Sequence, residues 1–231
     1  MTMIAENLQA VQTRIARACD QAGRDRAGVA LLAVSKTFDD LAVRSAFAAG
    51  QRAFGENYIQ EAVDKITALG DLPIEWHCIG PIQSNKTRLV AQHFAWAHTV
   101  DRLKTAQRLS DQRPENLPPL HVCIQVNVDG GVTKSGVAPQ DALELAQSIA
   151  QLPRLRLRGL MCIPEPAPDF VAACAVFARA KDLFDHLNAA GMALDTLSMG
   201  MSGDLEAAVA SGSTLVRVGS AIFGVRSYTA G

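Results

Sequence analysis

Short apolar runs alternate with longer amphipathic stretches along the whole chain of 231 residues. The apolar runs predict eight β-strands, at residues 29–35, 52–56, 75–79, 95–100, 121–127, 155–162, 196–199 and 215–219. The stretches between them predict helices at residues 39–49, 58–69, 85–92, 103–112, 139–151, 169–190 and 204–210, with an extra helix at 2–22. Strand–helix alternation without hairpin signals implies parallel strands and right-handed crossovers, and eight such units make a (β/α)8 barrel.

An open, doubly wound sheet is the rival architecture, and it would carry a Gly-rich nucleotide loop after a strand. The chain has neither a G-x-G-x-x-G nor a G-x-x-x-x-G-K-[ST] motif. We therefore predict a single α/β (TIM) barrel preceded by an extra N-terminal helix. The proline-rich segments 113–120 and 164–168 are ordinary connections, so we expect one domain over residues 1–231.

Composition argues against several classes of partner. The net charge is −1 and only 5% of residues are aromatic, so we expect no surface for nucleic acid. The first 21 residues are too polar for a signal peptide, and no apolar run approaches the length of a membrane span. The five cysteines show no C-x-x-C spacing and the five histidines no metal-ligand spacing. These features indicate a soluble cytoplasmic protein with free thiols, no metal and no membrane partner.

Lys36 follows the first predicted strand, where the apolar run ends. Desolvation at the mouth of an apolar sheet favours the neutral amine, which is a nucleophile toward carbonyl compounds and pyridoxal phosphate. A lysine that extends past the strand end into water is the alternative interpretation. The choice between the two depends on which residues the other strand ends contribute.

Polar residues and glycines gather at the carboxyl ends of the predicted strands, where barrel enzymes carry their active sites. Loops after strands seven and eight form the recurrent phosphate site of this fold, through backbone N–H groups and hydroxyls. Ser202 lies in the first of these loops, and Gly219 and Ser220 lie in the second. Ser202 could instead cap its helix and Ser220 fill a turn, but both coincide with the phosphate position.

Arg217 lies between Val216 and Val218, so strand alternation places it on the opposite face from both. If the valines pack against the helices, the guanidinium points into the barrel and needs a partner. That partner could be Glu56 across the barrel, or a bound ring or phosphate. Arginine beside a pyridine nitrogen would leave that nitrogen unprotonated, which makes pyridoxal phosphate a poor electron sink.

Asn57 and His77 are weaker candidates for contact with a ring substituent, because a polar residue that caps a strand or helix explains each equally well. Lys134 could be a second lysine over the barrel mouth, although a solvated loop lysine is the simpler interpretation. No G-x-S-x-G nucleophile motif is present, and we assign no catalytic residue.

Seven segments resemble signatures of the pyridoxal phosphate homeostasis proteins. They are residues 34–36 (VSK), 54–57 (FGEN), 76–86 (WHCIGPIQSNK), 134–136 (KSG), 158–161 (RGLM), 198–204 (SMGMSGD) and 216–224 (VRVGSAIFG). The resemblance implies a barrel like the N-terminal domain of alanine racemase, with pyridoxal phosphate held as a Schiff base on Lys36. It also implies phosphate binding around Ser202, Gly219 and Ser220, with Arg217 near the pyridine nitrogen. Family members are linked to the balance of B6 vitamers rather than to robust catalysis.

Three functions compete. The resemblance favours a protein that buffers or delivers pyridoxal phosphate, with apo-enzymes that use this cofactor as candidate partners and a monomer or weak dimer as the assembly. An amino-acid racemase on the same barrel would need a second proton carrier opposite the lysine, and the remaining tyrosines, Tyr58 and Tyr228, are not obvious bases. A class I aldolase would carry a carboxylate beside the lysine, and Ser35-Lys36-Thr37 supplies none. We therefore predict tight cofactor binding without efficient turnover.

Overall fold

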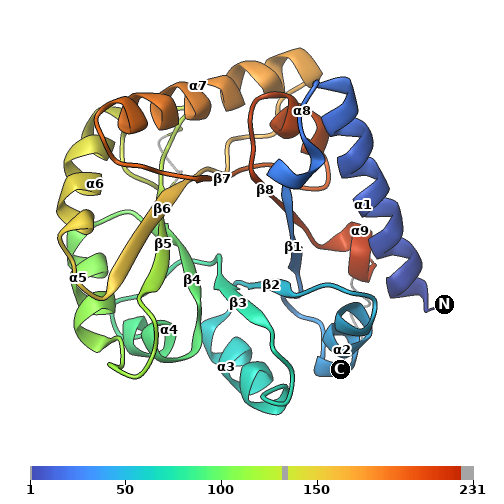
Figure 1. Ribbon diagram of the computed structural model, residues 1–231, viewed down its shortest axis with the longest axis horizontal. Helices are drawn as coiled ribbons and strands as arrows, with labels where there is room; N and C mark the ends of the chain where they lie inside the picture. The colour runs from blue at the N-terminus through green and yellow to red at the C-terminus, as the bar shows by residue number, and fades with distance from the viewer. Residues whose placement is uncertain (1, 132–134, 225–231) are drawn as a thin grey trace.

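Eight parallel strands close into one barrel in the computed structural model, which describes residues 2–131 and 135–224 (Figure 1). The strands are β1 (Ala30–Val34), β2 (Ala53–Glu56), β3 (Glu75–Cys78), β4 (Trp96–Val100), β5 (Leu120–Gln125), β6 (Leu155–Met161), β7 (Thr196–Ser198) and β8 (Leu215–Val218). They pair in sequence order, and β8 pairs with β1 to complete the ring. The predicted (β/α)8 barrel is confirmed.

Helices surround the ring of strands (Figure 1). They are α1 (Met3–Gln21), α2 (Asp40–Ala48), α3 (Ile59–Ala68), α4 (Thr87–His93), α5 (Leu103–Gln112), α6 (Ala142–Ala150), α7 (Phe170–Ala189), α8 (Leu205–Ala210) and α9 (Ser220–Phe223). Short 3-10 turns occupy Arg26–Gly28 and Pro139–Asp141, so the helix predicted at 139–151 starts as a tighter turn. No helix in the described part of the chain is long and apolar enough to cross a membrane.

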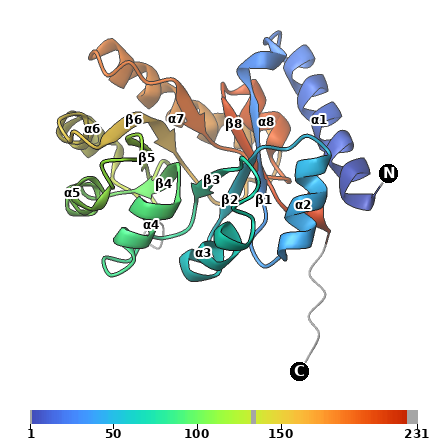
Figure 2. The ribbon, with the colours of Figure 1, turned by 60° about the horizontal axis from the view of Figure 1, so that its bottom comes forward.

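The N-terminal helix α1 packs against the outside of the barrel beside its last strand. The described residues after β8 form the single turn α9, which was not predicted, and α1 packs against α9, α8 and α2 (Figures 1 and 2). Its buried face carries Leu8, Val11, Ile15, Ala18 and Cys19 at helical spacing. Polar bonds add to this packing, because Asn7 donates to the carbonyl of Ile222 (3.0 Å) and Arg14 pairs with Glu206 (2.7 Å).

Side chains alternate between two separate cores. One face of each strand joins the large core between barrel and helices, as Phe54 and Val216 do. The opposite face fills the barrel interior, where Leu32, Val34, Ile79 and Leu215 form one apolar cluster and Trp96, Cys123 and Met161 form another. All five cysteines have free thiols, as predicted.

At Gly159, β6 lies too close to β7 to leave room for a side chain. A Cβ atom at this position would lie 1.6 Å from the carbonyl oxygen of Thr196 and 2.5 Å from its carbon. These are backbone atoms, which cannot move aside without breaking the pairing of Gly159 with Thr196. The barrel therefore closes in this register only with glycine here.

We predict that Gly159→Ala destabilises the protein by about 3 kcal/mol or more, because the new methyl group forces β6 and β7 apart. Urea unfolding followed by circular dichroism measures the change. Gly28→Ala is the matched control, since a Cβ at Gly28 meets no atom within 4 Å. Equal stability of the two variants would show that the strands separate at little cost.

Candidate functional site

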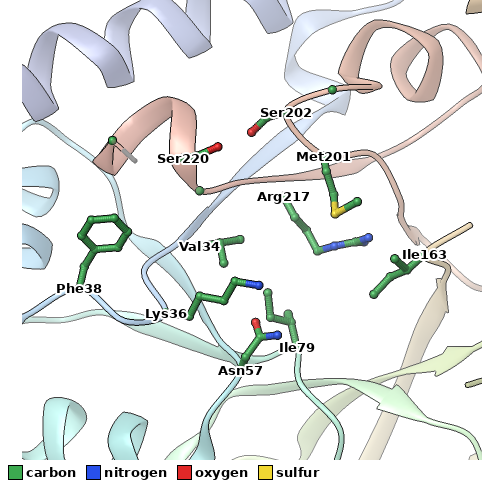
Figure 3. Close-up of a pocket in the computed structure, with 13 residues that line it drawn as sticks. Val34, Lys36, Phe38, Asn57, Ile79, Ile163, Met201, Ser202, Arg217 and Ser220 are labelled. Carbon is green, nitrogen blue, oxygen red and sulfur yellow. The ribbon is translucent and has the colours of Figure 1, made fainter. Parts of the chain in front are cut away.

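A cavity of about 650 Å³ opens at the carboxyl ends of the strands (Figure 3). Six of the seven predicted cofactor-binding residues line it together, and only His77 does not. The lining residues are Val34, Lys36, Phe38, Asn57, Ile79, Ile163, Met201, Ser202, Gly203, Arg217, Gly219, Ser220 and Gly224. The segments that contribute them are far apart in the sequence, and the parallel barrel brings their ends to one mouth.

Lys36 follows the end of β1 by two residues, and its amine points into the cavity (Figure 3). The next residue, Thr37, has a φ of 68°, in the left-handed region that β-branched residues rarely adopt. Such backbone strain persists only where the surrounding structure imposes it, and it concentrates at functional sites. The conformation of the chain around Lys36 is therefore held from outside the cavity.

A hydrogen-bonded network on the helix side of β1 fixes the backbone around Lys36. The Nζ of Lys65, on α3, donates to the backbone oxygen of Ser35 (2.9 Å) and to Oε1 of Glu56 (2.6 Å). The hydroxyl of Ser35 donates to the same Glu56 oxygen (2.7 Å), and Glu61 accepts the backbone N–H of Thr37 (3.0 Å). Both residues that flank Lys36 are thus fixed to side chains on the helix side of the sheet.

The sequence-based suggestion that Glu56 could pair with Arg217 is wrong. Glu56 shares the outward face of β2 with Phe54, so its carboxylate meets Lys65 on the helix side and cannot reach the barrel interior. Burial raises the pKa of Glu56, although the ammonium of Lys65 opposes this effect. The second carboxylate oxygen, Oε2, has no hydrogen-bond partner within the described ranges.

Arg217 points into the barrel, as strand alternation predicted. Its Nη1 donates to the hydroxyl of Ser198 (2.8 Å) and its Nη2 to the carbonyl of Cys162 (2.9 Å), so both of these partners are neutral. Burial lowers the pKa of the guanidinium, yet an arginine remains protonated near neutral pH. The side chain therefore brings one buried positive charge to the cavity.

The loops after β7 and β8 lie opposite Lys36. The hydroxyls of Ser202 and Ser220 point toward each other across this part of the cavity (Figure 3), and neither bonds to another described residue. The suggestion that Ser202 caps its helix is wrong, because Asp204 holds the cap position of α8. Gly219 lets its loop pack on β1, since a Cβ there would lie 3.1 Å from the carbonyl oxygen of Val34.

Asn57 also faces the cavity, and its Oδ1 is buried without a hydrogen-bond partner within the described ranges. Tyr58, which follows it, is the N-cap residue of α3 and is exposed. No side chain makes a capping hydrogen bond at this end of α3. Lys134 and Tyr228 lie outside the described residues. No cluster of side chains suited to a metal occurs within the described ranges.

His77 lies inside the barrel instead of at its mouth. Its two ring nitrogens contact Glu75 and His98, each at 2.9 Å, and its ring stacks on Trp96. The sequence predicts His77 near a strand end, but no local pattern indicates how deep that end lies in the closed barrel. His98 and Ser198, which connect it to Arg217, were not found, because their meeting depends on the register between distant strands.

The cavity thus combines an inward amine, a guanidinium, two facing hydroxyls and an orphaned amide oxygen. A primary amine can attack a carbonyl carbon, and hydroxyls beside glycines suit an anionic oxygen group. The arrangement fits a small ligand that bears both a carbonyl and a phosphate.

Comparisons with known proteins agree with this chemistry. The sequence profile described as "Alanine racemase, N-terminal domain" matches residues 6–227. The chain is 60% identical over 230 residues to the pyridoxal phosphate homeostasis protein of Pseudomonas aeruginosa, covering 100% of this chain and 99% of that protein. It is 53% identical over 233 residues to the protein of the same name from Vibrio cholerae, covering 99% of each.

One of the similar solved structures was determined with a ligand bound. PipY of Synechococcus elongatus, determined with PLP bound, superposes with a TM-score of 0.83 at 38% identity, covering 96% of this chain and 100% of that one. The barrel fold is therefore shared with a protein whose structure was determined with PLP bound.

We predict that Lys65→Met destabilises the protein by about 3–5 kcal/mol, because it leaves the Glu56 carboxylate buried without its counter-charge. The double variant Glu56→Gln/Lys65→Met should recover most of this loss, since no buried charge remains. Urea unfolding of the wild type and of these two variants measures their free energies of unfolding. Lys104→Met, on the exposed face of α5, is the matched control. A double variant as unstable as the single one would contradict the role assigned to the pair.

Proposed function

The chain belongs to the family of the pyridoxal phosphate homeostasis proteins, and we propose that it binds pyridoxal 5′-phosphate in the cavity at the barrel mouth. Its role is to keep the intracellular pool of this cofactor in balance, by holding it and releasing it to apo-enzymes in the cytoplasm. The observation that carries the proposal is the inward amine of Lys36 in the same cavity as two hydroxyls that have no described partner.

The residues present fit this cofactor. Asn57 has a buried amide oxygen without a described partner, which a polar ring substituent would satisfy. Gly203 lines the cavity with open space where a Cβ would project, which leaves room for a phosphate beside Ser202 and Ser220. The volume of about 650 Å³ lies in the range of small-molecule sites.

Each residue has a distinct task in this proposal. When bound, pyridoxal phosphate supplies an aldehyde that condenses with a primary amine and a pyridine ring that withdraws electrons. Lys36 supplies the amine, and its neighbours Ser35 and Thr37 are fixed from the helix side so that the amine stays in the cavity. Ser202, Ser220 and the backbone at Gly219 hold the phosphate. Arg217 faces the ring nitrogen as a donor.

The same residues make a poor catalyst. Racemisation by two bases needs a second proton carrier opposite Lys36. Among the described residues, no carboxyl, imidazole, phenol or thiol lines the cavity, and Lys36 supplies the one amine there. Arg217 does not give up its proton, so the ring nitrogen stays unprotonated and carbanions gain little stabilisation. A binding protein without efficient turnover follows from this lining.

We predict that borohydride reduction of the loaded protein, followed by peptide mapping, places the covalent adduct on Lys36. Lys36→Arg should lose the adduct, because the variant keeps the positive charge but a guanidinium is not a nucleophile at neutral pH. Lys104→Arg, at an exposed lysine, is the matched control and should keep it. An adduct on another lysine, or one that survives in Lys36→Arg, would overturn the site assignment.

We also predict that the loaded protein racemises amino acids at less than about 1 s⁻¹, the low end of ordinary enzyme turnover. The reason is the missing second proton carrier in the described part of the cavity. L- and D-amino acids are incubated with the protein, and their enantiomers are separated by chiral chromatography. Lys36→Arg gives the background rate. Racemisation at enzyme-like rates with any amino acid would favour the racemase interpretation.

A further inference from the structure

Five side chains form a continuous hydrogen-bonded chain through the barrel interior. Arg217 Nη1 bonds to Ser198 Oγ (2.8 Å), and Ser198 Oγ bonds to His98 Nδ1 (3.0 Å). His98 Nε2 contacts His77 Nδ1 (2.9 Å), and His77 Nε2 contacts Glu75 Oε1 (2.9 Å). The chain begins at the cavity and ends at the half-exposed first residue of β3, and its four other members are at most 4% exposed.

The direction of every bond in this chain follows from Glu75. A carboxylate can only accept, so His77 donates to it from Nε2 and, as a neutral ring, accepts at Nδ1. His98 therefore donates from Nε2 to His77 and accepts the Ser198 hydroxyl hydrogen at Nδ1. The Ser198 oxygen in turn accepts from the guanidinium of Arg217, which can only donate. Each imidazole makes one donated and one accepted bond as a neutral ring.

The surroundings hold the rings in this arrangement. His77 stacks on Trp96 with 5.2 Å between ring centroids and 9° between planes. Trp96 is itself covered by the guanidinium of Arg158, 4.7 Å from its ring centre, and stacked on His121. Burial lowers the pKa of both His77 and His98, in agreement with neutral rings. The chain thus has one fixed orientation.

A polar chain of this kind is costly in a barrel interior, where aliphatic layers would pack without desolvating polar groups. A fully satisfied network instead specifies one geometry. Here it fixes Arg217, since Ser198 on one Nη and the Cys162 carbonyl on the other leave the guanidinium plane no freedom to rotate. The remaining N–H groups of Arg217 are then available to the cavity that this residue lines.

We propose that His98 is a positioning residue that, through Ser198, aims the Arg217 guanidinium at the bound cofactor. His98 does not line the cavity and acts only through this chain. The proposal rests on the binding of pyridoxal phosphate proposed above. It gives His98, which lies on β4 inside the barrel, a role in cofactor binding although this residue does not line the cavity.

Two variants of His98 separate positioning from packing. His98→Gln keeps one acceptor for Ser198 and one donor for His77, whereas His98→Leu removes both. We expect His98→Leu to release pyridoxal phosphate at least about tenfold faster than the wild type and to shift the absorption band of the bound cofactor. His98→Gln should keep the wild-type band and release rate within about threefold. His186→Leu, on the exposed face of α7, is the matched control.

Release is measured by passing loaded protein into an excess of a hydrazine trap, and the band by absorption spectroscopy. If His98→Leu unfolds at a lower temperature but keeps the wild-type band and release rate, the residue is only structural and the proposal is overturned. Failure of the wild type to take up the cofactor would instead contradict the proposed function.

A second measurement needs neither variant nor cofactor. Nitrogen-15 NMR of the imidazoles in the wild-type protein without cofactor should show His77 and His98 as neutral rings with hydrogen on Nε2 near neutral pH. This result supports the chain even if His98→Leu fails to fold. Hydrogen on Nδ1 of His98 would reverse the bond to Ser198 and overturn the proposal.

Discussion

The pairing of β1 with β8 is the interaction on which the candidate site depends. In this register Leu32 lies beside Arg217 and Ala33 beside Val218, so the segment that carries Lys36 emerges next to the turn that carries Gly219 and Ser220. No other pair of strands brings together a residue from the start of the chain and one from its end. The packing of α1 on α8 and α9 supports this seam from outside.

The protein manages its buried charges in two different ways. On the helix side, Glu56 and Lys65 form a close pair that fixes the backbone around Lys36 but leaves one carboxylate oxygen without a described partner. Inside the barrel, Arg217 bonds to neutral oxygens, and the one on Ser198 is connected through two imidazoles to the half-exposed carboxylate of Glu75. The first arrangement holds an amine in place, and the second holds a guanidinium in place. The groups that hold Lys36 and Arg217 in place do not line the cavity themselves.

Much of this structure could be predicted from residues close together in the sequence. Strand–helix alternation gave the barrel, the end of an apolar run gave Lys36, and the two valines beside Arg217 gave its inward direction. The partners of those residues could not be predicted in the same way. Ser198, His98 and Lys65 meet their partners only because the strands close with a particular stagger, which no local pattern encodes. His77 was placed at the mouth for the same reason, since its depth depends on that stagger.

The pairing of β1 with β8 also determines when the cavity can form during folding, because residues that follow these two strands line it. During synthesis, Lys36 leaves the ribosome before the loops on the other side of the cavity, which follow β7 and β8. The contacts between α1, β1 and β8 span nearly the whole sequence, so they form late in folding. An incomplete chain therefore exposes the amine without the opposing hydroxyls. The proposed cofactor site is therefore complete only after β8 has paired with β1.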